Sequence, residues 1–190
     1  SQDRFPRMMA DVNGDGRADL VAFGYAGMQV ALADGDGGFG APRLVLRDFA
    51  VGAGGWTSQD RFPRMMADVN GDGRADLIAF GFAGVQVALA DADGGFAAPR
   101  LVLADFAVGA GGWASQDQFP RMAADVNGDG RADLIGFGFR GVSVAFAHAS
   151  GDFAEPDMAL PEFGWVTGDW TSQDRFPRMM ADVNGDGRAD

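Results

Sequence analysis

The sequence predicts an all-β protein, a β-propeller whose four-stranded blades are repeats of 57 residues. The first observation is the repeat itself: the segment that begins at Ser1 with Ser-Gln-Asp-Arg-Phe-Pro-Arg recurs at Ser58, at Ser115 with one Arg replaced by Gln, and at Ser172. A fixed period of this length is typical of solenoids and propellers. The second observation is that each unit holds four short apolar segments between glycine-rich turns, as a propeller blade does.

The repeat divides the chain into three complete units and the start of a fourth. The complete units occupy residues 1–57, 58–114 and 115–171. Residues 172–190 should form the first strand and the acidic loop of a further blade. The first two units are nearly identical, whereas the third departs from them after Phe139.

Within one unit, the expected strands are short and are joined by tight turns. Gly-Asp and Gly-Gly pairs separate the apolar segments, as in antiparallel hairpins. No segment shows the 3.6-residue apolar period of a helix. A parallel β-helix has much shorter coils, and a sandwich would not need such exact repetition, so a propeller is favoured. In the first unit the expected strands are Arg7–Val12, Asp19–Gly24, Gly27–Ala33 and Arg43–Leu46, with a turn at Asp34–Gly38.

Composition excludes several classes of protein. The 190 residues include 15 basic and 27 acidic side chains, for a net charge of −12, which argues against a nucleic-acid partner. There is no cysteine, so neither a disulfide nor a thiolate metal site is expected. No apolar run approaches the length of a membrane span. The first residues do not resemble a signal peptide, and export stays open because a signal is removed from the mature protein.

An acidic loop in every unit has the spacing of a Ca²⁺ site. Oxygen-bearing side chains stand at loop positions 1, 3, 5 and 9, a glycine at position 6 permits a sharp turn, and position 7 offers its backbone carbonyl. An EF-hand would need Glu at position 12, where Ala22 stands. The predicted ligands are Asp11, Asn13, Asp15, Arg17 and Asp19; Asp68, Asn70, Asp72, Arg74 and Asp76; Asp125, Asn127, Asp129, Arg131 and Asp133; and Asp182, Asn184, Asp186 and Asp190.

The alternative is that Asp, Asn and Gly only make turns in these loops. Four carboxylate-rich loops would then hold like charges without compensation, whereas four Ca²⁺ ions would reduce the net charge from −12 to −4. A saturated loop leaves no open coordination position for chemistry, so the expected role of the metal is structural. The loop at 182–190 ends with the printed sequence, and its occupancy is left open.

The loop and the segment after it, Leu20–Gly27, resemble FG-GAP/VCBS repeats. These repeats build β-propellers in integrin α-chains and in many secreted microbial proteins, with Ca²⁺ in the same kind of loop. The linker from Trp56 to Pro63-Arg64 occurs in far fewer proteins than the acidic loop does. It is similar to the linker of the seven-bladed lectin family of Psathyrella velutina. The resemblance implies a secreted, non-enzymatic lectin that binds N-acetylglucosamine-type sugars between blades.

The linkers between units carry the groups that sugar recognition needs. An aromatic ring suits the C–H face of a sugar, and planar amide, carboxylate and guanidinium groups suit hydroxyls and an acetamido group. The alternative is that these residues only pack blades together. The candidate sugar-binding residues are Trp56, Gln59, Asp60 and Arg64; Trp113, Gln116, Asp117 and Arg121; and Trp170, Gln173, Asp174 and Arg178.

Other functions and the assembly are also constrained. No Ser/His/Asp constellation repeats, and His148 is the single histidine, so an enzyme is not expected, a propeller hydrolase being a weak third choice. An adhesion propeller of the integrin type, or an engineered or fragmentary scaffold, is the alternative to a lectin. Three blades leave two sheet edges to be covered. We therefore expect head-to-tail self-association into a closed ring of six or seven blades, most simply a homodimer.

Overall fold

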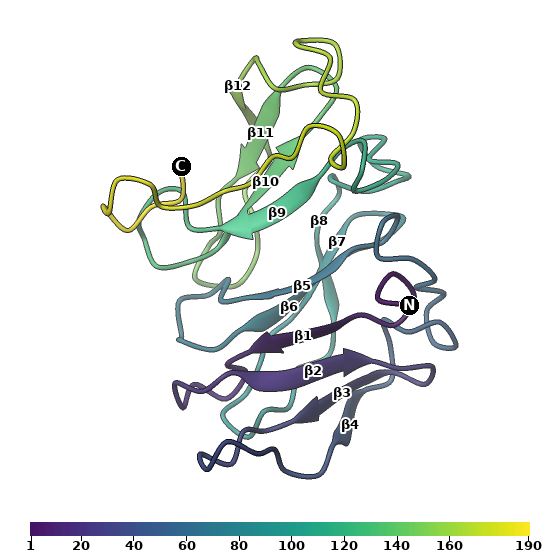
Figure 1. The fold of residues 1–190 in the computed structure, drawn as a ribbon, viewed down its shortest axis with the longest axis vertical. Coiled ribbons are helices and arrows are strands. Elements are labelled where there is room, and N and C mark those ends of the chain that lie inside the picture. The colour runs from purple at the N-terminus through teal and green to yellow at the C-terminus, as the bar shows by residue number, and fades with distance from the viewer.

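A computed structural model describes residues 1–190 and contains twelve β-strands and no helix. The strands form three separate four-stranded antiparallel sheets, one in each complete repeat, so the predicted blades are confirmed. Each sheet is a simple meander in which the strands neighbour one another in chain order (Figure 1). The strands are β1 Arg7–Ala10, β2 Asp19–Phe23, β3 Met28–Ala31 and β4 Arg43–Leu46; β5 Arg64–Ala67, β6 Asp76–Phe80, β7 Val85–Ala88 and β8 Arg100–Leu103; β9 Arg121–Ala124, β10 Asp133–Phe137, β11 Val142–Ala145 and β12 Asp157–Leu160.

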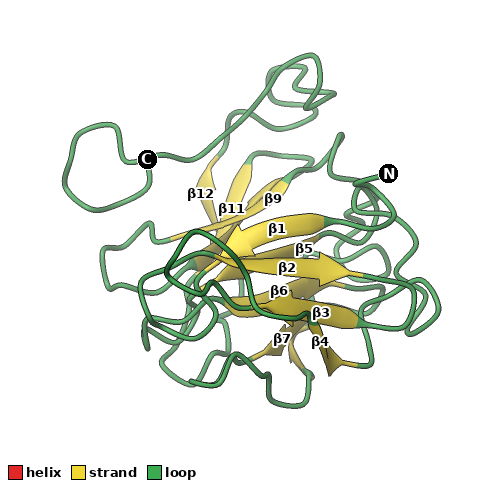
Figure 2. Cartoon of the chain, turned by 60° about the horizontal axis from the view of Figure 1, so that its bottom comes forward, coloured by secondary structure: helices red, strands yellow, loops and turns green.

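The blades are arranged like those of a propeller, with their first strands on the inside of a fan. Across blades, only the first strands come close to one another, β1 to β5 and β5 to β9. Figure 2 shows the three sheets stacked side by side, with the C-terminal end of the chain projecting as a loop. Apolar side chains that alternate along the second and third strands fill the space between sheets. The core therefore lies between blades rather than within one.

Three strands of the first unit are shorter than predicted, and the second of them only by one residue, since it ends at Phe23 rather than Gly24. The first strand ends at Ala10 rather than Val12, because the N–H of the buried Val12 binds the Asp19 carboxylate instead of a strand partner. The third strand ends at Ala31, and Ala33 forms only an isolated bridge with Phe39. These are end effects at the loops that connect the strands.

Residues 172–190 form the predicted loop but not the predicted strand. Residues 178–181, which match β1, are not in a strand. A strand needs a partner, and the partner of β1 is β2, which begins at Asp19; the matching position here is Asp190, the last in the sequence.

No helix in the structure could cross a membrane.

Candidate functional site

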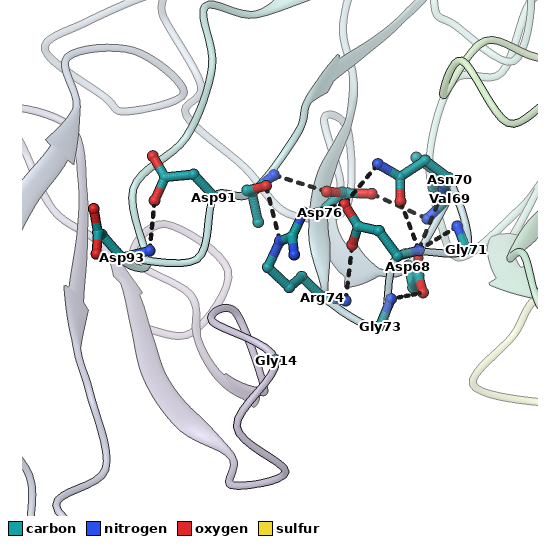
Figure 3. Close-up of polar contacts among 12 residues, drawn as sticks. Gly14, Asp68, Val69, Asn70, Gly71, Gly73, Arg74, Asp76, Asp91 and Asp93 are labelled. Carbon is teal, nitrogen blue, oxygen red and sulfur yellow. Dashed lines mark hydrogen bonds and ion pairs between the residues drawn. The ribbon is translucent and has the colours of Figure 1, made fainter.

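Each acidic loop is organised by its first aspartate. In the second blade, Asp68 Oδ1 accepts the N–H of Gly71 and Oδ2 accepts the N–H of Gly73, both at 2.7 Å (Figure 3). Both glycines have positive φ, 80° and 83°, a conformation that costs glycine little and other residues more. Asp72 accepts the Asn70 amide at 2.9 Å and pairs with Arg74. The loop is thus a preformed turn that presents oxygen atoms.

The last aspartate of each of the first three loops, Asp19, Asp76 and Asp133, is buried and ties its loop to the sheet. Asp76 Oδ1 accepts the N–H of Ala90 at 2.7 Å, and its Oδ2 accepts the N–H of Val69 at 3.1 Å (Figure 3). Burial, with smaller contributions from the like charges of Asp72 and Asp68, raises the pKa of Asp76 to about 6. Burial likewise raises the pKa of Asp133 in the third blade. A carboxylate in this setting would gain from a nearby positive charge.

The donor chemistry of these loops fits a hard cation. Carboxylate, amide and carbonyl oxygens are the ligands that Ca²⁺ takes. The mutual repulsion that Asp68, Asp72 and Asp76 share would be relieved by a divalent ion. As the side chains stand, however, no three acidic or histidine groups converge to hold a metal, because Asp68 binds the loop N–H groups and Asp72 binds Arg74. Calcium therefore remains a prediction.

Acidic loops of neighbouring blades are linked through their backbones. The carbonyl of Asp11 accepts the N–H of Ala75, and that of Asp68 accepts the N–H of Ala132, each at 2.7 Å. The loop at the end of the chain makes the same contact, from Ala189 to Asp125. The first aspartate of a loop therefore holds its own turn through the side chain and the next blade through the backbone.

Gln59 and Arg64, two of the predicted sugar-binding residues, bind each other. The Gln59 Nε2 donates to the Arg64 carbonyl at 2.6 Å, and its Oε1 accepts the Arg64 N–H at 3.2 Å and the Nε–H at 3.1 Å. We therefore assign this pair to the linker rather than to the sugar site. The same bonds join Gln116 to Arg121 and Gln173 to Arg178.

The arginine of the linker is buried between blades. Arg64 Nη1 donates to the Phe49 carbonyl at 2.8 Å, while its Nη2 is buried without a hydrogen-bond partner. Burial lowers the pKa of Arg64 to about 10 and that of Arg121 to about 9. A buried arginine that contacts the preceding blade serves packing, and the sequence did not distinguish this role from ligand binding.

The aspartates of the linkers lie in a different place from the tryptophans. Asp60, Asp117 and Asp174 line a hollow of about 700 Å³ together with Asp3, and this hollow shares no residue with those lined by tryptophan. Asp3 Oδ1 accepts the N–H groups of Asp60 (3.0 Å) and Gln59 (2.8 Å), which lower the pKa of Asp3. These carboxylates connect one linker to the next.

Trp56 and Trp113 are core residues with one edge on a hollow. They are only 5% and 7% exposed. The Trp56 ring lies 5.0 Å from that of Phe49 and 6.0 Å from that of Phe62, between centroids. Trp170, in the third linker, lines an apolar hollow of about 400 Å³ between the third blade and residues 177–190. The tryptophans therefore supply the floor of a site and the packing beneath it.

A hollow of about 350 Å³ lies at the junction of the first and second blades. Its floor is Trp56 with Phe62, and its wall on the second blade carries the exposed ring of Phe82. Two polar side chains, Asp48 and Gln86, belong to opposite sides of the junction. The remaining lining residues are Gly54, Gly55, Gly81 and Ala83.

The next junction has a matching hollow of about 260 Å³. Its lining residues stand 57 positions after those of the first: Gly111, Gly112, Trp113, Phe119, Gly138 and Phe139. The uncovered edge of the first blade carries half of such a hollow, with Phe5, Gly24 and Gln29 in the places of Phe62, Gly81 and Gln86. The hollows thus recur with the repeat.

The candidate residues predicted from the sequence did not include three that line the hollow at the first junction: Asp48, Phe82 and Gln86. A signal was present, because an aromatic residue recurs as Tyr25, Phe82 and Phe139. Their exposures of 68%, 63% and 55% mark them as unusual surface residues, but the sequence does not give exposure.

Comparison with known proteins gives one family and several structures. Residues 68–136 match the model of FG-GAP-like repeats. No curated protein matches the chain significantly. The chain is similar to an Agrocybe aegerita lectin, described by its specific recognition of non-reducing terminal N-acetylglucosamine, with a TM-score of 0.90 and 39% identity. The match covers 99% of this chain and 46% of the lectin, so the chain spans less than half of the lectin's length.

More distant similarity extends to a part of a much larger assembly. A TcdB2-TccC3 structure without its hypervariable C-terminal region matches with a TM-score of 0.54 and 28% identity, over 70% of this chain and 6% of that chain. A TcdB2-TccC3-TEV structure matches with a TM-score of 0.55 and 26% identity, over 72% of this chain and 6% of that chain.

Proposed function

Because the chain is built from FG-GAP-like repeats and shares the propeller-blade fold of a fungal lectin, we propose that it is a non-enzymatic carbohydrate-binding protein. The observation that carries the proposal is the hollow at the first junction, where Trp56, Phe62 and Phe82 surround Asp48 and Gln86. The ligands we propose are N-acetylglucosamine-type glycans, on the strength of the ligand in the lectin's description.

The chemistry of the hollow suits a pyranose ring. An exposed aromatic face such as that of Phe82 accepts the C–H groups of a sugar, and a carboxylate accepts its hydroxyls. The amide of Gln86 has both a donor and an acceptor, which match the N–H and C=O of an acetamido group. A small concave site with a few polar groups on an apolar lining is typical of ligand sites. We further propose that the protein acts outside the cell, where such glycans are presented.

The direct test is a titration of the 190-residue chain with N-acetylglucosamine, followed by ¹⁵N-edited NMR. We expect chemical-shift changes at Phe82 and Gln86, and competition by N-acetylglucosamine-terminated oligosaccharides on a glycan array. Mannose serves as the control sugar because it lacks the acetamido group. Silence on the array together with capture of a protein ligand would favour an adhesion propeller instead.

We also propose that each complete acidic loop binds one Ca²⁺, held in the second blade by Asp68, Asn70, Asp72, Asp76 and the Arg74 carbonyl. Bound calcium would supply positive charge to the buried carboxylates and so stabilise the blade. Support comes from the oxygen-only donor set and from the burial of Asp76, which together with the like charges of Asp72 and Asp68 raises its pKa.

Finally, we propose that another blade completes the cover of the outer face of the third blade, which residues 177–180 cover only in part. This face exposes an apolar hollow of about 400 Å³ to which Phe137, Val142, Leu160 and Trp170 contribute. The apolar surface that the hollow leaves open to water is costly. A second copy of the chain, joined head to tail, is the simplest source of the missing blade.

A further inference from the structure

We propose that the two inter-blade hollows differ in function: the first is the site of an N-acetylhexosamine, and the second does not take that sugar. The inference rests on the proposed lectin function and narrows it to one junction. Both hollows share the aromatic floor and the exposed Phe, so the repeat alone would make them equivalent. They differ in polar groups, in volume and in the position of the tryptophan.

The first difference is the carboxylate on the wall. Asp48 lines the first hollow and accepts one hydrogen bond, from the Phe49 N–H to Oδ1 at 2.7 Å. Its counterpart, Asp105, accepts the Phe106 N–H at 2.5 Å and also the Trp113 Nε1–H at 3.0 Å, and it is not part of the second hollow. Both of these bonds go to Oδ1 of Asp105. The first hollow therefore has a carboxylate on its lining that can accept sugar hydroxyls, whereas the lining of the second hollow has none.

The second difference is the amide. Gln86 lines the first hollow. If Gly81 carried a Cβ atom, that atom would lie 3.3 Å from Nε2 of Gln86 and 3.5 Å from Cη2 of Trp56, so the amide and the indole ring lie close to the same point. The amide therefore reaches over the floor of the hollow. At the second junction the matching residue is Ser143, which is shorter and is not among the lining residues. The second hollow has no side-chain amide or carboxylate.

The third difference is the position of the tryptophan ring. A Cβ on Gly136 would lie 2.4 Å from Cη2 of Trp113 and 2.4 Å from Cε1 of Phe106, so only glycine admits these rings at that position. In the second blade the same position is Ala79, whose methyl group is buried. The angle between the Trp and Phe ring planes is 57° at the first junction and 39° at the second.

These three differences have one consequence for recognition. A sugar in the first hollow finds an aromatic face, a carboxylate acceptor and an amide. A sugar in the second hollow would lose water from its hydroxyl and acetamido groups without gaining partners, which is unfavourable. The volumes, about 350 and 260 Å³, point in the same direction. Gln86 and Asp48 are thus the specificity-determining residues.

The test is an NMR titration with free N-acetylglucosamine that reads the two hollows separately. For the unmodified chain we expect one site, with shifts at Phe82 and Gln86 and none at Phe139 and Ser143. Gln86→Ser should weaken binding by about tenfold or more, because the acetamido group loses its partner. Ser143→Ala is the matched control and should leave binding unchanged.

A gain-of-function variant tests the same claim in reverse. The double variant Gly136→Ala, Ser143→Gln gives the second junction the residues that the first junction has at these positions. We expect it to bind sugar at a second site, with chemical-shift changes at Phe139. Ser143→Gln alone, which adds no buried methyl group, keeps the test usable if the double variant does not fold, and it should give a weaker second site. Two equal sites in the unmodified chain, or no gain in folded variants, would overturn the inference alone. Absence of any binding would overturn the proposed function with it.

Discussion

The guanidinium of Arg121 lies over the ring of Phe80, with Cζ 5.4 Å from the ring centroid, and so joins the third blade to the second. Arg64 over Phe23 and Arg178 over Phe137 repeat this contact. Because cation–π contacts strengthen when the cation is desolvated, the burial that lowers the pKa of Arg121 to about 9 also makes this contact effective. The linker arginines Arg64, Arg121 and Arg178 therefore each hold neighbouring repeats together.

Replacing Arg121 with Ala should destabilise the chain by about 2–4 kcal/mol, because it removes a packed side chain and leaves buried acceptors unpaired. Urea unfolding followed by tryptophan fluorescence measures the effect. Arg7 is the matched control, since it occupies the same position of the repeat but is exposed. Equal stability of the two variants would return Arg121 to the candidate ligand-binding residues.

Asp76→Asn should destabilise the second blade by about 1–3 kcal/mol, since an amide offers one acceptor where the carboxylate serves two N–H groups, those of Val69 and Ala90. Thermal unfolding in the presence of a chelator isolates this effect from metal binding. Asp190→Asn is the control, because that exposed carboxylate accepts only the Val183 N–H, at 3.3 Å. A similar change in both variants would contradict the anchoring role of Asp76.

Removal of calcium should lower the melting temperature of the chain, because the carboxylates of each loop would be left to repel one another. Elemental analysis after dialysis should find about one calcium per complete loop, and added Ca²⁺ should restore the melting temperature after treatment with a chelator. A chain that carries no calcium and does not respond to it would remove the metal from the proposal.

Phe82→Ala should abolish sugar binding while the fold persists, because the ring is exposed and its loss leaves no cavity in the core. Trp56→Ala should instead cost about 3–5 kcal/mol of stability, as expected for a large buried aromatic residue. Tyr25→Ala is the control for Phe82, because the hollow on that side of the first blade is only half formed. If the Phe82→Ala variant still bound the sugar, the binding site would not be the hollow at the first junction.

The mass of the chain in solution tests the proposed ring. Light scattering should give about twice the 19.9 kDa of one chain if two copies close head to tail. Dilution should shift this mass towards the monomer. A mass of one chain at all concentrations would contradict self-association.

Local patterns were enough to predict the strands and the loops. In the first unit, alternating apolar residues and glycine turns predict β1 to β4 to within two residues at their ends, because strand formation depends on neighbouring residues and on the adjacent hairpin. The loop spacing also predicted a tight turn with glycine at its sixth position, whereas the calcium that this turn is expected to hold stays a prediction. The missing strand at 178–181 shows the limit of the same logic, since a strand needs its partner.

The sequence by itself determined the repeat, the blade and the acidic loop, because each of them is formed by residues that follow one another in the chain. Only the tertiary structure decided that Gln59 and Arg64 bind each other and that Trp56 is buried. It alone brought Asp48 and Gln86 to one hollow. The physical reason is that packing between blades, which joins residues distant in the chain, sets the direction of each side chain.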